Sequence, residues 1–263
     1  MKTHLFTTAS GLLAELIFPR GCACCGKSLF RSEETRTGLC GACRSGLSAA
    51  VSADIKRCAV CGKPLVSERE TCMACRRGPP HFFDRLFPVF PYRDEYRKLL
   101  RAYKFGSRRN LGHFLRECLV NAALSPFWEN TLGFGPAGSG ETAEAGKLSW
   151  VPVPPRPGKL RRAGWDQVEY LAKLLEKDGR PVCRCLKRLD SGVQKTLGRE
   201  KRRINLRGKI QAGKDYLGGK RKIPETALVF DDVYTTGSTM DACAETLKSA
   251  GTTAVYGICL FYD

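Results

Sequence analysis

The residues from Ala227 to Thr239 constrain the fold more than any other part of this chain. They begin with four apolar residues, a run typical of a strand buried on both faces of a parallel sheet. Two adjacent carboxylates, Asp231 and Asp232, follow this strand. A hydroxyl-rich turn then opens a helix that runs to Ser249, and a Ser or Thr side chain is predicted to cap it. The sequence therefore predicts a strand, a turn and a helix, with two acids at the strand end.

The turn and the acid pair suit two different parts of one ligand. A helix N-terminus offers unpaired N–H groups and the positive end of a dipole, which makes the turn a cradle for phosphate. The turn residues are Thr235, Thr236, Gly237, Ser238 and Thr239. Carboxylates repel phosphate, so Asp231 and Asp232 suit a sugar diol or a magnesium ion held through oxygen ligands. Together they describe a site for ribose 5-phosphate. The alternative is an ordinary capped helix without a ligand.

The same stretch resembles the 5-phosphoribosyl 1-pyrophosphate (PRPP) binding motif of type I phosphoribosyltransferases. The resemblance implies that Asp231 and Asp232 contact the ribose hydroxyls and that the turn from Thr235 to Thr239 wraps the 5-phosphate. It also implies that magnesium accompanies PRPP. The fold class expected is α/β, with a mostly parallel sheet flanked by helices and a small N-terminal zinc-ribbon domain.

The N-terminal third is dominated by cysteines in four C-x-x-C knuckles. Two knuckles joined by a short hairpin supply the four soft ligands of a tetrahedral zinc ion, so we predict a double zinc ribbon with two zinc ions over residues 21–78. The predicted ligands are Cys22, Cys25, Cys40 and Cys43 in the first ribbon and Cys58, Cys61, Cys72 and Cys75 in the second. Cys24 is an alternative ligand, but it breaks the spacing that the other knuckles share. The segment has little apolar content, so the metal is expected to supply most of its folding free energy.

Charge and cysteine usage bear on the compartment and on the partners. The formal net charge is +18, and two tetrathiolate zinc sites would lower it to about +14. Such a surface attracts polyanions, including nucleic acid and phosphorylated metabolites. Paired cysteines without a secretory signal favour metal binding in a reducing cytoplasm. Residues 1–20 are expected to form a short amphipathic helix, because Glu15 interrupts an apolar run too short for a membrane span. A membrane-surface role for this helix is the alternative.

The phosphoribosyltransferase-like domain is expected over residues 79–263. A strand is predicted within residues 82–92, followed by two helices within residues 94–121. The basic run over residues 93–109 suits either a solvated helix face or a track for nucleic acid. Residues 135–147 form a low-complexity loop with no assigned function. A strand is also predicted at residues 184–190, where Cys183 and Cys185 are interpreted as packing residues.

A short strand from Leu148 ends in a Pro-rich loop that carries Arg156 and Lys159. A rigid loop with cations at the carboxyl edge of a parallel sheet suits a pyrophosphate group; the alternative is a basic turn at a domain edge. A helix is expected to follow, ending near Lys177. Residues 191–208 are polar and basic, as expected of a mobile lid over an anionic ligand, or else of a basic connector.

Taken together, the order of parts resembles the ComF family, in which a double zinc ribbon precedes a type I phosphoribosyltransferase domain. The zinc domain would then pack above the PRPP site, where related enzymes carry a hood. The turn that usually reads Arg-Gly-Phe-Asn-Gln in this family has Ala163 and Asp166 at its first and fourth positions here. A cation is missing and a carboxylate is added beside the predicted pyrophosphate site. The adjacent Arg162 is a candidate substitute for the missing cation.

The ComF resemblance implies a cytoplasmic protein that handles single-stranded DNA in natural competence, with competence proteins at the membrane face as partners. Three functions stay open. In the first, the chain is an enzyme of the ComF type in which a nucleophile displaces pyrophosphate from ribose C1, with no general base evident. In the second, it is a module that binds PRPP and DNA without turnover. In the third, it is an active phosphoribosyltransferase of nucleobase or nucleotide salvage with an added zinc domain.

Overall fold

The computed structural model describes residues 21–52, 55–67, 69–106, 108–128, 148–189 and 208–263. The expected N-terminal helix, the loop at residues 135–147 and all of the expected lid except Gly208 lie outside these residues.

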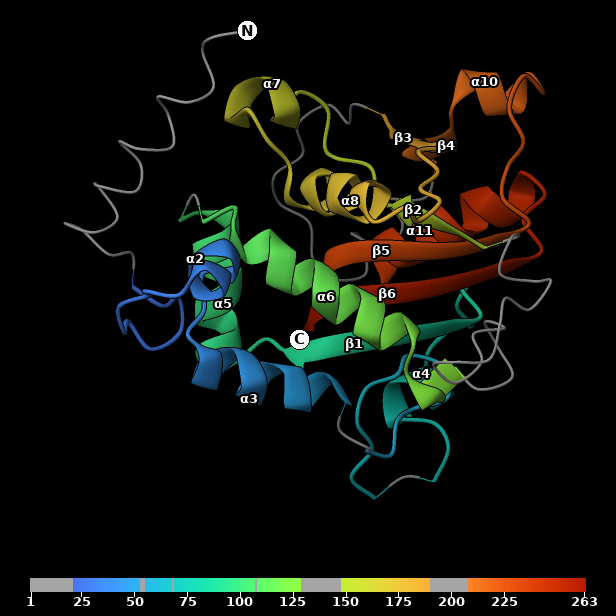
Figure 1. Cartoon of the computed structure of the whole chain (residues 1–263). Helices are drawn as coiled ribbons and strands as arrows, with labels where there is room; N and C mark the ends of the chain where they lie inside the picture. Colours follow the sequence, from blue (N-terminus) through green and yellow to red (C-terminus); the bar gives the residue numbers. More distant parts are fainter. Residues whose placement is uncertain (1–20, 53–54, 68, 107, 129–147, 190–207) are drawn as a thin grey trace, which may run out of the picture.

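A parallel sheet forms the centre of the fold (Figure 1). Its order is β1 (Arg85–Pro91), β6 (Ala254–Tyr262), β5 (Thr226–Tyr234) and β2 (Leu148–Pro152), and each neighbouring pair runs parallel. The apolar runs make strands that are buried along most of their length. The expected strands are confirmed, but β5 extends past the acid pair to Tyr234.

Helices cover both faces of this sheet (Figure 1). One face packs against α5 (Asp94–Lys104), α6 (Leu111–Ala123) and α8 (Gln167–Lys177), and the short η1 (Pro126–Trp128) joins the same core. The opposite face packs against α11 (Ser238–Ser249). The α/β class predicted from the sequence is confirmed, and a parallel sheet flanked by helices is consistent with a phosphoribosyltransferase-like fold.

The first ribbon (residues 21–52) contains α2 (Ser32–Thr37) and α3 (Gly41–Ser52). Its apolar side chains join the core of the main domain beside α5 and α6. The buried ones are Leu29, Leu39, Leu47 and Val51. Apolar burial therefore contributes to the stability of this ribbon in addition to any bound metal.

The second ribbon (residues 55–77) contains α4 (Met73–Arg77) and covers the outer edge of β1. The Leu86 backbone N–H donates to the Val60 carbonyl at 2.9 Å. The Arg57 guanidinium donates to the carbonyls of Gly62 and Pro88 at 3.0 and 3.2 Å. An edge strand that would otherwise expose its backbone groups is thereby paired.

Four further elements were not expected in this form. The strand predicted near residue 184 is β3 (Leu186–Arg188), but it pairs antiparallel with β4 (Ile210–Ala212) in a separate small sheet. The Pro-rich loop contains a short helix, α7 (Lys159–Ala163), and α10 (Lys214–Leu217) precedes β5. Within the described residues, none of the helices combines the length and the apolarity that crossing a bilayer requires.

Candidate functional site

Two groups of four cysteines converge as the sequence predicts. The sulfur atoms within each group lie within 4.8 Å of one another, and the groups are Cys22, Cys25, Cys40 and Cys43, and Cys58, Cys61, Cys72 and Cys75. The distances Cys25 Sγ–Cys40 Sγ and Cys61 Sγ–Cys72 Sγ are both 3.7 Å. A tetrahedral zinc ion holds its sulfurs about 3.8 Å apart, so both groups fit zinc. Cys24 lies outside the first group, which confirms the choice of Cys22.

Backbone N–H groups stabilise the thiolate form of one cysteine in each group. Burial alone would raise the pKa of the Cys22 thiol, but N–H groups of Cys25 and Cys40 outweigh it and lower that pKa to about 7. The pKa of Cys58 is about 7 for the same reason, and the Cys72 N–H donates to its sulfur at 3.3 Å. Zinc binds thiolates, so these N–H groups favour the ligand form.

Asp232 is the centre of a buried polar network at the carboxyl end of β5. Its side chain is only 10% exposed, and Oδ2 accepts from Lys104 Nζ at 2.8 Å and from Gln167 Nε2 at 2.6 Å. Burial would raise the pKa of this carboxyl, but Lys104 and Gln167 stabilise the carboxylate and lower it. Asp232 is therefore ionised and held in one orientation.

Asp231 has the opposite electrostatic environment. Burial and the neighbouring charge of Asp232 raise its pKa well above the usual value of an aspartate. Its Oδ1 accepts from the Asp232 backbone N–H at 2.8 Å. The two acids thus differ. The charge of Asp232 is balanced by Lys104, whereas a hydroxyl donor or a cation would stabilise the ionised form of Asp231.

The Pro-rich loop contacts the acid pair through Gln167. Lys159 Nζ donates to Asp166 Oδ2 at 2.5 Å and also contacts the Gln167 side-chain oxygen, so this predicted pyrophosphate ligand is engaged within the protein. Asp166 caps α8 by accepting from Val168 N and Glu169 N, both at 3.0 Å. The extra carboxylate of this turn is thus paired and buried. Arg156 is exposed on the same loop.

The turn from Thr235 to Thr239, the phosphate loop, opens α11 without a side-chain cap. The expected Ser or Thr cap is wrong: the N-cap is Gly237, with φ of 79°. A Cβ there would lie 2.9 Å from the Tyr234 hydroxyl, so the turn requires glycine. The hydroxyls of Thr236 and Ser238 bond to each other at 2.7 Å. Thr236 Oγ1 accepts from the Ser238 N–H at 3.4 Å, while Gly237 has no side chain to cap the remaining N–H groups of the first turn, which can therefore bind an external anion.

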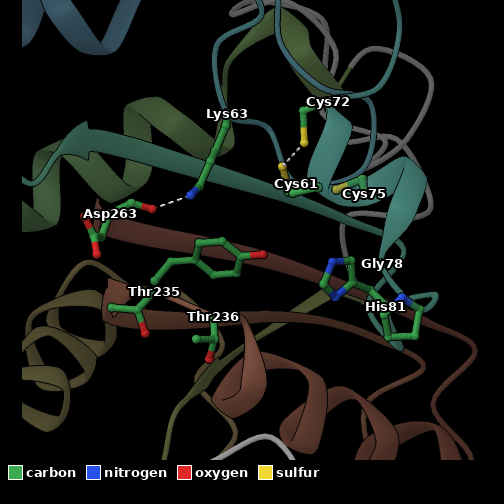
Figure 2. A pocket seen from close by; sticks show the side chains of 12 residues that line it. Cys61, Lys63, Cys72, Cys75, Gly78, His81, Thr235, Thr236 and Asp263 are labelled. Atoms are coloured by element: carbon green, nitrogen blue, oxygen red, sulfur yellow. Dashed lines mark hydrogen bonds between the residues drawn. The ribbon is translucent and has the colours of Figure 1, made fainter. Parts of the chain in front are cut away.

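A cavity of about 280 Å³ separates the phosphate loop from the second ribbon. Figure 2 shows the residues of both segments that line it. The lining includes Thr235 and Thr236 from the loop and Cys61, Lys63 and His81 from the other side. The second ribbon therefore lies beside Thr235 and Thr236 of the phosphate loop.

Three residues at or near the candidate site were not predicted as site residues from the sequence. Lys104 lies in the basic run, where nothing distinguishes it from its neighbours. Arg188 of β3 lies close enough to Asp231 and Arg156 for their charges to affect it, although burial is the main cause of its lowered pKa. His81 Nδ1 lies 2.9 Å from Asp241 Oδ2, a contact across 160 residues of chain. A single sequence gives no signal for such distant pairs.

Comparison with known proteins identifies one part of the chain. Residues 13–76 match the family described as "Double zinc ribbon domain". No curated protein matches the chain. The N-terminal region is a double zinc ribbon with two four-cysteine sites.

Proposed function

We propose that this chain is a PRPP-binding, phosphoribosyltransferase-like protein of the ComF type. The observation that carries the proposal is the arrangement of Asp232. Asp232 comes three residues before the phosphate loop and accepts from Gln167 Nε2 at 2.6 Å, and the Gln167 side-chain oxygen in turn contacts Lys159 beside the Pro-rich loop. One strand end thus joins a phosphate cradle, a pair of acids and a cationic loop.

Each part of PRPP then has a partner of suitable chemistry. The 5-phosphate accepts from N–H groups and hydroxyls of the phosphate loop. The ribose hydroxyls donate to Asp231 and Asp232, whose orientations are set by Asp232 N and Lys104. Arg156 is the exposed cation for the leaving pyrophosphate, and Lys159 would exchange Asp166 for a phosphate oxygen. Arg188 adds a charge near Arg156. Bound magnesium would add positive charge at the pyrophosphate oxygens.

If the protein turns over, the reaction is a displacement at ribose C1. The lone pair of an acceptor nitrogen forms the bond to C1 as the bond to the pyrophosphate oxygen breaks, and pyrophosphate leaves with that electron pair. The contribution of the chain is positioning and charge stabilisation, and no step uses the zinc ions. Whether the same pocket serves transfer or recognition is the point that the experiment below separates.

A role in handling single-stranded DNA is supported by how the basic run divides. Lys104 pairs with Asp232, and Arg108 bonds the Gly21 carbonyl, so two of its cations are used internally. The others are exposed, namely Arg93, Arg97, Lys98, Arg101 and Arg109. Exposed cations on and beside one helix suit phosphate contacts that weaken as salt increases.

The test is calorimetric titration of PRPP and magnesium into the wild-type protein and an Asp231→Asn/Asp232→Asn variant. Asp215→Asn, which removes an exposed carboxylate of α10, is the matched control. We expect micromolar binding that is lost in the double variant and kept in the control. No binding by folded, zinc-loaded wild-type protein would overturn the proposal.

Repeating the titration with single-stranded oligonucleotide locates the DNA path. Competition would place DNA across the pocket, whereas independent binding would place it elsewhere. An assay for pyrophosphate release with each nucleobase then distinguishes an enzyme from a binding module.

A further inference from the structure

The two knuckles of the second ribbon each continue into a contact with the phosphate loop or its flanks. Lys63 follows the knuckle of Cys58 and Cys61, and His81 lies just beyond the knuckle of Cys72 and Cys75. Three of these cysteines line the same cavity as Thr235 and Thr236 (Figure 2).

The first contact restrains the chain before the loop. Lys63 Nζ donates to the backbone oxygen of Asp263 and lies 5.7 and 5.8 Å from the ring centres of Tyr234 and Tyr262. The Asp263 N–H in turn donates to the Tyr234 carbonyl at 3.1 Å. Tyr234 is the residue immediately before the phosphate loop. Lys63 therefore holds the end of β5, where the phosphate loop begins.

The second contact restrains the chain after the loop. Asp241, in the first turn of α11, accepts from the Phe82 backbone N–H at 3.0 Å and contacts His81 Nδ1 at 2.9 Å. His81 also stacks on Phe83, with ring centres 4.4 Å apart. Because Asp241 is only 7% exposed, this contact is shielded from water and fixes the direction of the helix N-terminus.

The second ribbon is itself rigidly placed on the sheet. Gly62 has φ of 65°, and a Cβ at this position would lie 2.1 Å from the Leu86 carbonyl oxygen. The Arg57 guanidinium lies 4.2 Å from the centre of the Phe87 ring. The first ribbon, by contrast, packs in the core on the other face of the sheet. The two zinc sites therefore have different relations to the phosphate loop.

We propose that the second zinc site positions the phosphate loop, so that zinc in this site and the 5-phosphate of the ligand stabilise each other's binding. The inference rests on the proposed function. A tetrathiolate zinc fixes both knuckles, Lys63 and His81 then hold the two ends of the loop, and the helix N–H groups stay aligned on the phosphate. Because coupling between two binding sites is reciprocal, PRPP must also retain this zinc.

The first measurement is zinc release from the full-length protein to a chromophoric chelator, with and without PRPP and magnesium. We expect two kinetic phases, with PRPP slowing one about tenfold and leaving the other unchanged. The unchanged phase is an internal control, since chelation of zinc by PRPP itself would change both phases.

Two variants test the contacts while keeping all eight cysteines. Lys63→Met removes the cation, and His81→Phe keeps the ring that stacks on Phe83 but loses Nδ1. Each is expected to weaken PRPP binding about tenfold and to abolish the protection of zinc. Lys56→Met, an exposed lysine of the same ribbon, is the matched control and should leave both values unchanged.

The outcomes separate this inference from the function on which it rests. Wild-type protein that binds PRPP but releases both zinc ions at the same rates with and without it overturns the inference and leaves the function standing. The same conclusion follows if Lys63→Met and His81→Phe bind PRPP like the wild type. Wild-type protein that binds no PRPP removes both proposals.

Discussion

Lys104 Nζ donates to Asp232 Oδ2 at 2.8 Å, joining α5 to the end of a strand 128 residues further along the chain. A lysine within a basic run is thus the counter-ion of one of the two candidate ribose-binding acids. The pair is largely buried, with the lysine side chain 29% and the aspartate side chain 10% exposed. Loss of either partner would leave the other charge largely buried and without its counter-ion.

Substitution Lys104→Met is expected to lower the free energy of unfolding by roughly 2–3 kcal/mol, because the Asp232 carboxylate stays buried without its cation. Urea unfolding at neutral pH measures this. Arg101→Met removes an exposed cation from the same helix and should change the value by less than about 0.5 kcal/mol. Equal effects of the two substitutions would show that the ion pair contributes nothing particular.

Substitution Asp231→Asn is expected to stabilise the protein without ligand while removing PRPP binding. The pKa of Asp231 is raised in the folded state, so the folded state binds the extra proton. Its contribution to stability is therefore fully present below the unfolded pKa of about 4 and is lost as pH rises through the folded pKa. The variant cannot ionise and avoids this loss.

The gain in melting temperature for Asp231→Asn should therefore be small in acid and increase with pH. At pH values above the pKa of Asp231 in the folded state, the gain should reach roughly 2–4 °C. Thermal unfolding of both proteins across a pH series measures it. A gain that shrinks as pH increases would contradict the sign.

Substitution Asp166→Asn is expected to strengthen PRPP binding by roughly threefold to tenfold, a gain of about 1 kcal/mol, since it removes a negative charge near the pyrophosphate and leaves Lys159 only its contact with Gln167. Asparagine still caps α8, so stability should change little. Asp166→Ala removes the same charge but loses the cap, at a cost of about 1 kcal/mol. Calorimetry measures PRPP binding by both variants, and urea unfolding measures their stability, so the effect of the charge is separated from that of the helix cap. Weaker PRPP binding by the asparagine variant would contradict the prediction.

Gly26 and Gly62 occupy equivalent positions, each directly after a knuckle, and both have positive φ. Their surroundings differ: a Cβ at Gly26 meets no atom within 4 Å, whereas one at Gly62 meets the Leu86 carbonyl oxygen. Gly26→Ala should cost about 1–2 kcal/mol of stability from backbone conformation alone. Gly62→Ala should cost roughly 3 kcal/mol or more, because the second ribbon must also separate from β1.

The same pair tests the relation between the second ribbon and the ligand site. Gly62→Ala is expected to weaken PRPP binding, while Gly26→Ala leaves it near the wild-type value. Urea unfolding and PRPP calorimetry on both variants, each with two zinc ions confirmed by metal analysis, provide the comparison. Equal stability losses for the two variants would mean that the ribbon is not anchored at Gly62.

Local patterns in the sequence determined the zinc ligands, the α/β class and most strands and helices. C-x-x-C spacing favours four pairs of sulfurs, with Cys24 left as an alternative, and the apolar run before Asp231 is typical of a buried strand. The assignment of the acids and the phosphate loop to PRPP remains a prediction, since it depends on the chemistry of a ligand. The cap on α11 was wrong because the turn requires positive φ at Gly237, which a Ser or Thr at that position would not readily adopt.

Tertiary structure alone decided which polar groups face one another. Lys104, Gln167 and Asp232 come from three segments, and their contact depends on how α5 and α8 pack over the sheet. His81 and Asp241 meet for the same kind of reason. Backbone conformation and metal spacing depend on neighbours along the chain, so the sequence by itself determined them. Charge pairing depends on distance in space, and only the folded chain sets that distance.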